Sequence, residues 1–215
     1  MLEHIDWTSF TATMLVLIIS ITIHEFAHAI TSDKLGDDIP RLQGRISLNP
    51  IDHLDPMGTF MMAVTAIAHF GVGWGKPVMT NPRKYKNPHR GSTLVSLAGP
   101  VSNLLLALVF AGIVRLNYSM HFIADDSLAD VFVTKGVVVN CALFFFNLIP
   151  VPPLDGFQVF LGFFAEKHAI SIRNAIQPLS LILFMVLIFS GVTRYILWPP
   201  TYALVEFLTG WTFQR

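Results

Sequence analysis

The sequence is poor in charge. Asp, Glu, Lys and Arg make up only 13% of its 215 residues, about half the share of roughly 25% that is usual for soluble domains. The 14 basic and 14 acidic side chains cancel, so the net charge gives no indication of a nucleic-acid partner. Hydrophobic residues reach 53% and include 18 Phe, which excludes a disordered, solvated chain. These proportions indicate a protein of the lipid bilayer, in which each remaining charge needs a reason.

The sequence is also short of cysteine, and it has no basic segment near its N-terminus. Cys141 is the single cysteine, which excludes an internal disulfide and a Cys-rich zinc site. We interpret it as a small core residue. No basic stretch precedes the first apolar run, so we expect that run to be retained and not cleaved as a signal peptide.

Long apolar windows are what the sequence has instead. A membrane-spanning helix needs about 20 mostly apolar residues. Such windows cover residues 10–30, 56–75, 94–114 and 136–154, and a further apolar run begins at Pro178 and continues to Trp198. The window at 56–75 is interrupted by four glycines. We therefore predict an all-α polytopic membrane protein with about four transmembrane helices.

The basic residues indicate how the chain is oriented. Eight of the 14 lie between the first and third windows, and three Asp residues follow the third. The positive-inside rule therefore places residues 34–90 on the cytoplasmic side. A full crossing by 56–75 would separate these basic residues, so we favour a re-entrant segment there, with an ordinary short helix as the alternative. The eight are Lys34, Arg41, Arg45, Lys76, Arg83, Lys84, Lys86 and Arg90.

Residues 39–49 read IPRLQGRISLN. Apolar and polar residues partly alternate around Gly44, a pattern that is typical of two short strands joined by a turn. We therefore predict a short membrane-associated β-ribbon in this segment.

The first window contains three ionisable residues, His24, Glu25 and His28, in the order HEFAH. Ionisable groups inside a spanning helix are costly and mark functional sites. The two histidines lie one helical turn apart on one face, so both can reach a single Zn²⁺. Glu25 can take a proton from the zinc-bound water and transfer it to a leaving amine. A polar cluster without metal is the alternative, but the apolar flanks offer it no partners.

A hydrolytic zinc needs a third protein ligand and an open fourth position. Asp155 is the strongest candidate because it follows an apolar span and three prolines, in NLIPVPPLDG, where a regular helix must end. Unwound backbone is tolerated at membrane depth where it lines a cavity. We interpret Glu166 and Glu206 as interfacial charges. His53 could be an accessory group at the cavity mouth, although a turn histidine is the simpler interpretation, and His69 is interpreted as a packed histidine.

Three segments together resemble the site-2 protease family of intramembrane zinc metalloproteases: HEFAH at 24–28, AGPVSN at 98–103 and NLIPVPPLDG at 147–156. The resemblance is closest to the short prokaryotic type, which lacks PDZ and CBS domains. It covers about residues 8–165. This implies a single membrane-embedded metalloprotease domain over residues 1–215, with a helical C-terminal region at 166–215.

The resemblance also implies a role for each matching residue. Glu25 would be the general base of a site that holds one Zn²⁺ per chain. Asn147 would hold substrate or help to stabilise the oxyanion, and Asn103 would support the active-site region. The metal ligands would be His24, His28 and Asp155.

The implied activity is hydrolysis of peptide bonds within or next to transmembrane segments of membrane proteins. The protein would be multi-pass in the plasma membrane, with its active site towards the cytoplasmic side. The ribbon at 39–49 could pair with an unwound substrate segment. Two alternatives stay open: a catalytically inactive zinc-binding or transport protein, and a membrane zincin that acts on exposed loops with a Glu as third ligand.

Overall fold

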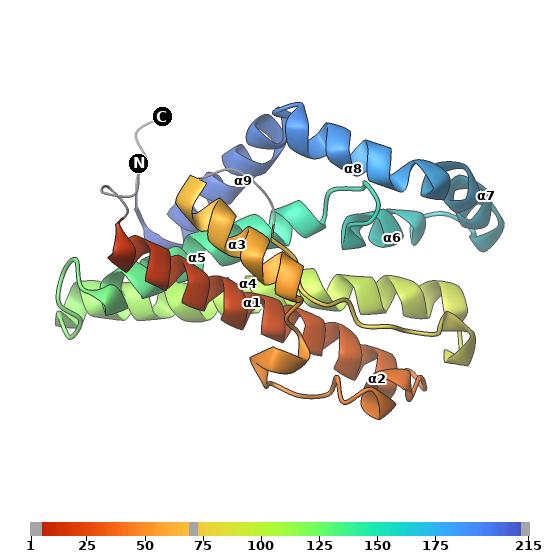
Figure 1. Cartoon of the computed structure of the whole chain (residues 1–215), viewed down its shortest axis with the longest axis horizontal. Helices are drawn as coiled ribbons and strands as arrows, with labels where there is room; N and C mark the ends of the chain where they lie inside the picture. The colour runs from red at the N-terminus through yellow and green to blue at the C-terminus, as the bar shows by residue number, and fades with distance from the viewer. Residues whose placement is uncertain (1–5, 69–72, 212–215) are drawn as a thin grey trace.

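The structure is a computed structural model that describes residues 6–68 and 73–211 (Figure 1). It is helical, and the described ranges contain no strand, so the prediction of an all-α protein is confirmed. The same ranges contain single-turn 3₁₀ helices at Pro50–Asp52, Pro82–Lys84 and Gln177–Leu179. The α-helices are α1 (Trp7–Lys34), α2 (Ile39–Leu42), α3 (Pro56–Ala68), α4 (Pro88–Met120), α5 (Leu128–Asn147), α6 (Asp155–Leu161), α7 (Glu166–Ile176), α8 (Ser180–Phe189) and α9 (Val192–Thr209).

Within the described ranges, four helical segments are long and apolar enough to cross a membrane. They are α1, α4 and α5, with 28, 33 and 20 residues, and the run of 24 residues from α7 to the end of α8. At 1.5 Å per residue, about 20 residues cross the roughly 30 Å hydrocarbon core. The number agrees with the four helices expected. The apolar run expected from Pro178 to Trp198 is, however, divided at Ser190 and Gly191, between α8 and α9.

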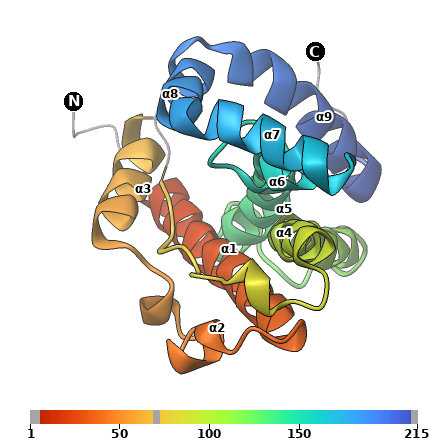
Figure 2. The same ribbon diagram turned by 90° about the vertical axis from the view of Figure 1, so that its right-hand side faces the viewer.

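Three of these helices form the centre of the molecule. α4 packs against α1 and α5, and α1 also packs against α5. Their N-termini are capped by Asp6, Asn87 and Ser127, whose side chains accept hydrogen bonds from backbone N–H groups of the first turn. Such caps fix where each helix begins. Figure 2 shows α7, α8 and α9 arching over one side of this bundle, with α3 on the flank of α1.

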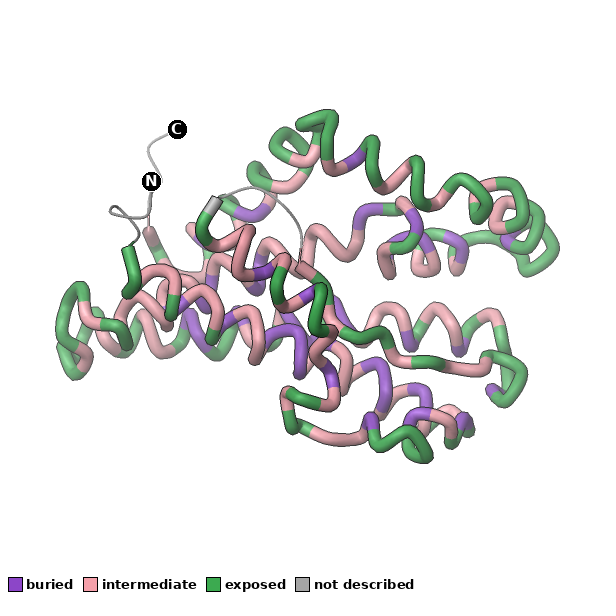
Figure 3. The backbone as a smooth tube through the Cα atoms, in the orientation of Figure 1, coloured by how far each residue is buried: buried purple, intermediate pink, exposed green. Residues whose placement is uncertain are grey.

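Burial follows the same arrangement. Buried segments gather where α1, α4 and α5 meet, whereas α8 is mostly exposed or half-buried (Figure 3). A buried cluster joins α4, α5 and α9, with Phe110, Val137, Cys141 and Val205 among its members. Cys141 is therefore a core residue, as the sequence suggested. The apolar side chains left outside suit contact with lipid, not water.

The prediction of a β-ribbon at residues 39–49 is wrong. Ile39–Leu42 is the short helix α2, and Pro40 occupies its first turn, where a missing N–H costs nothing. The N–H groups of Gln43, Gly44 and Arg45 bond back to carbonyls within the same turn, so they do not pair across strands. The described residues contain a single β-bridge, between Leu54 and Gly75, on either side of α3.

Helix α3 has 13 residues and is about 20 Å long, shorter than the hydrocarbon core. Trp74 lies against the first turn of this helix. A Cβ atom on Gly58 would be 2.0 Å from the carbonyl oxygen of Trp74, so the close approach requires a glycine. The chain then returns to the end of α1, where Asn81 N–H donates to Asp37 and the hydroxyls of Tyr85 and Ser32 are 2.8 Å apart. Leu54 and Gly75, on either side of the α3 segment, lie next to each other. His69, within the 56–75 window, lies outside the described residues.

The helix breaks expected between α5 and α6 are present. The chain leaves the helical conformation after Asn147 and resumes it at Asp155, so the intervening prolines lie in non-helical backbone. α6 packs against α4. This arrangement turns the first residue of α6 towards α1.

Candidate metal centre

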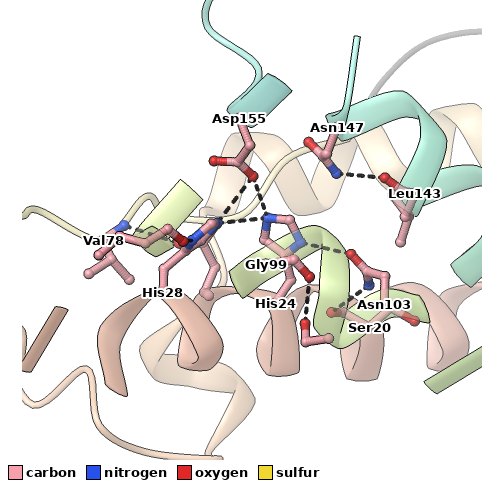
Figure 4. Close-up of polar contacts among 12 residues, drawn as sticks. Ser20, His24, His28, Val78, Gly99, Asn103, Leu143, Asn147 and Asp155 are labelled. Carbon is pink, nitrogen blue, oxygen red and sulfur yellow. Dashed lines mark hydrogen bonds and ion pairs between the residues drawn. The ribbon is translucent and has the colours of Figure 1, made fainter. Parts of the chain in front are cut away.

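Three of the side chains that the sequence proposed as metal ligands come together in space. His24 Nε2 and His28 Nε2 each lie 3.2 Å from Asp155 Oδ2, and the two nitrogens are 3.0 Å apart. Figure 4 shows both imidazoles rising from α1 towards the Asp155 carboxylate on α6. All three ligand atoms lie within 4.8 Å of one another, and among the described residues they form the one such group.

A residue of α4 that carries no side chain makes room for this cluster. Gly99 packs directly against the two histidines. A Cβ atom on Gly99 would lie 2.4 Å from His28 Nε2 and 2.6 Å from His24 Nε2, distances that no real side chain tolerates. The AGPVSN segment therefore lets α4 approach the ligands closely, a reason that the sequence pattern alone did not reveal.

Hydrogen bonds fix the orientation of both imidazole rings. His28 Nδ1 lies 2.7 Å from the carbonyl oxygen of Val95, and His24 Nδ1 lies 2.7 Å from Asn103 Oδ1. A carbonyl oxygen only accepts, so each Nδ1 carries a hydrogen, and Nε2 is the nitrogen through which the neutral ring can bind a metal. Partners of this kind orient metal-binding histidines. Asn103 thus contacts His24, one of the three proposed ligands.

Asn103 is itself held by a residue that sequence reasoning missed. Its amide Nδ2 donates to Asn140 Oδ1 at 3.1 Å and to the Ser20 carbonyl at 3.4 Å, which leaves Oδ1 to face His24. Asn140 in turn donates to the Gly136 carbonyl at 2.9 Å. Both amides are completely buried. The signal available in the sequence was a lone Asn in the apolar stretch GVVVNCALFFF of α5.

Glu25 lies beside the cluster and is held from the opposite side. Its Oε2 accepts a hydrogen bond from the backbone N–H of Val78 at 3.0 Å, and Arg45 Nη2 lies 3.8 Å away. Val78 belongs to the segment that returns from α3. The carboxylate is therefore close to the ligands but is not one of the clustered ligand atoms.

A cavity of about 620 Å³ contains the cluster and Glu25. Its walls are largely apolar and come from α1, α4, the end of α5, the segment 73–80 and α8. A volume of this size lies within the range of roughly 300–1,000 Å³ that is usual for ligand pockets. Asn103 and Asn147 also line it, together with Leu181, Phe184 and Met185 of α8.

The remaining candidates are not members of the His24, His28 and Asp155 cluster. Asn147 donates its amide to the Leu143 carbonyl at 3.0 Å. His53 is completely buried in the turn before α3, with Nε2 2.7 Å from the Ser47 carbonyl oxygen. Glu166 is exposed at the start of α7, and Glu206 lies in α9. His53, Glu166 and Glu206 do not line the cavity.

The fold and the site define a class: an integral membrane protein in which two histidines and a carboxylate face one another beside a glutamate. Residues 12–190 match the family described as Peptidase family M50. The chain belongs to this family, the site-2 protease family. Family membership and the membrane character of the chain support a protease with metal-dependent chemistry.

Curated relatives agree with this assignment. "Putative zinc metalloprotease YwhC" of Bacillus subtilis (strain 168) is 40% identical over 189 residues, which are 86% of this chain and 84% of that protein. "Putative zinc metalloprotease Rip2" of Mycolicibacterium smegmatis is 32% identical over 145 residues, 65% of this chain and 52% of the relative. The Rip2 of Mycobacterium tuberculosis (strain H37Rv) is 31% identical over 142 residues, with the same coverage of 65% and 52%. No solved structure matches the chain.

Proposed function

We propose that this chain is a single-domain, zinc-dependent intramembrane endopeptidase that hydrolyses peptide bonds within or next to transmembrane segments of other membrane proteins. The observation that carries the proposal is the cluster of His24, His28 and Asp155 beside Glu25, in an apolar-walled cavity among helices long enough to span a bilayer. Burying ionisable groups in such surroundings costs free energy, so they mark a functional site.

The donor set fits zinc. Two imidazole nitrogens and one carboxylate oxygen are a ligand set typical of catalytic zinc, which keeps a fourth position open for water or substrate. The Nδ1 hydrogen bonds of His24 and His28 leave both Nε2 atoms available. His24, His28 and Asp155 would hold one Zn²⁺ per chain. When bound, the ion supplies a Lewis acid that polarises the scissile carbonyl and lowers the pKa of the attacking water.

The chain's own residues would handle the proton and the substrate. Glu25 Oε2 would accept the proton of the attacking water and then deliver it to the nitrogen of the leaving amine. Asn147 lines the cavity, and its amide would donate a hydrogen bond to the substrate carbonyl or to the developing oxyanion. Asn103 would keep His24 in the orientation that a metal ligand needs.

The surroundings of the site support a membrane-embedded substrate. Leu181, Phe184 and Met185 present apolar side chains of α8 to the cavity, which suits the side chains of a transmembrane segment. A helical peptide bond is blocked by its own hydrogen bonds, so the substrate must unwind locally before it reaches Glu25. Residues 39–49 form no ribbon, so this segment offers no strand edge with which an unwound substrate could pair.

The placement of the basic residues supports a site near the cytoplasmic face of the plasma membrane. Lys84 pairs with Asp38 beyond the end of α1, so the loop after α3 returns to the end of the bundle where α1 finishes. We infer that residues 56–75 form a re-entrant segment and that this end is cytoplasmic. His24 and His28 lie in the half of α1 nearest this end.

The substitution Glu25→Gln tests the proposal. Full-length protein in liposomes should keep one zinc per chain, while cleavage of a test transmembrane segment falls by about 100- to 10,000-fold, the usual contribution of a general base. Zinc content and product formation are measured on the same preparations. Cleavage by the Gln variant at the wild-type rate would overturn the mechanism, and a wild type that binds zinc but cleaves nothing would favour an inactive zinc-binding protein.

Replacing the proposed third ligand separates this mechanism from that of a zincin with a Glu ligand. Asp155→Asn should lose both zinc and cleavage, whereas Glu166→Gln, at the exposed start of α7, should lose neither. The reverse pattern would show that Asp155 is not the ligand.

A further inference from the structure

One buried cation outside the spanning helices is not used by the proposed mechanism. Arg45 follows α2, and only 4% of its side chain is exposed. Burying a guanidinium is costly unless other groups pair with it. Burial lowers the pKa of Arg45, while the charges of Glu25 and Asp52 raise it. The groups that contact the Arg45 guanidinium therefore indicate its role.

Arg45 connects the two chain segments that flank α3. Nη1 donates to the carbonyl oxygen of Asp52, before the helix, and Nη2 donates to the carbonyl oxygen of Lys76, after it. The Nε–H has no hydrogen-bond partner among the described residues. Hydrogen bonds from this one side chain thus hold the backbone on both sides of α3.

The same nitrogen that holds Lys76 also faces Glu25. Arg45 Nη2 lies 3.8 Å from Glu25 Oε2, and that oxygen accepts the N–H of Val78, two residues beyond Lys76. The guanidinium and the 76–78 backbone therefore act on one carboxylate oxygen together. Moving Arg45 would release Lys76 and, with it, the N–H group that orients Glu25.

We propose that Arg45 is a positioning residue for the general base, which fixes the segments on both sides of α3 and thereby holds the Glu25 carboxylate in place beside the metal ligands. The inference rests on the proposed function of Glu25. A planar fork of donors can bind two carbonyl oxygens and face a carboxylate at the same time, which the single ammonium of Lys does less well.

Kinetics of Arg45→Lys and Arg45→Met, in the full-length protein with zinc bound, test the inference. We expect kcat to fall about 10-fold for Lys and about 100-fold for Met, the range for groups that orient active-site residues. Zinc content should stay at the wild-type value, because neither variant touches the metal ligands. The matched control is Arg41→Met, which removes the same charge from an exposed side chain that pairs with Asp33 and should leave kcat unchanged.

A wild-type kcat in both Arg45 variants would overturn the inference, as would a fall in kcat that only follows a loss of zinc. If Arg45→Met does not fold, Arg45→Lys decides the outcome, since it keeps the charge.

A double-mutant cycle on melting temperature gives a readout that needs no activity. Arg45→Met removes the charge that faces Glu25, so it should lower Tm less in a Glu25→Gln background than in the wild type. Equal decreases in both backgrounds would mean that the two residues act independently, and would overturn the inference. A wild type that cleaves nothing would end the proposed function, while the cycle would still decide whether Arg45 and Glu25 are coupled.

Discussion

At the scale of single residues, Gly99 decides whether α4 can lie against the metal ligands. Gly99→Ala would place a methyl group 2.4 Å from His28 Nε2 and 2.6 Å from His24 Nε2, so either α4 or the imidazoles must move. A displaced ligand binds zinc less tightly, because metal affinity depends on ligand geometry. We expect zinc content to fall well below one per chain, with cleavage lost in proportion. Metal analysis of the purified variant measures this.

Gly112 offers a matched control on the same helix. A Cβ atom there meets nothing within 4 Å, so Gly112→Ala should keep its zinc and gain about 0.5–1 kcal/mol of stability from the better helix former. Full zinc occupancy in the Gly99→Ala variant would show that α4 can retreat without disturbing the ligands.

These residues also show which parts of the site the sequence could predict. His24 and His28 lie four positions apart on one helix, so local geometry was enough to pair them. Asp155 was found because acidic residues are scarce and the prolines before it end a helix. Gly99, Asn140 and Arg45 act through contacts between segments far apart in the chain. Their functions could not be read from spacing, since nothing in the sequence states which helices touch.

At the scale of elements, short segments were harder to predict than long ones. The windows that became α1, α4 and α5 were long and apolar, and a 20-residue apolar run has few alternatives in a bilayer. Residues 39–49 offered only a few alternating positions. There, Pro40 and the local N–H bonds of a tight turn outweighed a weak strand pattern. Periodicity over so few residues does not distinguish a ribbon from a short helix with a turn.

The topology of the α3 segment gives a prediction at this scale. A re-entrant segment leaves the loop after α3 on the cytoplasmic side, where the basic residues gather. In a Cys141→Ala background, a cysteine in place of exposed Arg83 should react with a membrane-impermeant maleimide only from the cytoplasmic side. A cysteine in place of Asp125, in the loop between α4 and α5, should react only from the other side. Labelling of position 83 only from the extracytoplasmic side, with position 125 then reacting from the cytoplasmic side, would require α3 and the segment after it to cross the membrane.

At the scale of the whole molecule, the scarcity of charge has a simple explanation. Apolar side chains on the outside of the helices suit lipid, and eight of the 14 basic residues lie between residues 34 and 90. The three ionisable residues in the second half of α1, His24, Glu25 and His28, meet Asp155 at one cavity. The site joins the first spanning helix to α6, more than a hundred residues later in the chain. A metal held there would connect two parts of the molecule that otherwise meet mainly through α4 and α5. Zinc should therefore contribute to the stability of the entire fold.

Removal of the metal tests this coupling. A ligand that binds only the folded state, at about 1,000 times its Kd, stabilises a protein by about 4 kcal/mol, which corresponds to a Tm shift of roughly 10 °C for a chain of this length. We expect chelation to lower Tm by that order, and added zinc to restore it. In Asp155→Asn, which keeps the two imidazoles but loses the carboxylate that joins α6 to α1, the chelator should have a much smaller effect. Equal melting temperatures with and without chelator in the wild type would mean that the metal does not connect α1 with α6, and the assignment of Asp155 as a ligand would have to be abandoned.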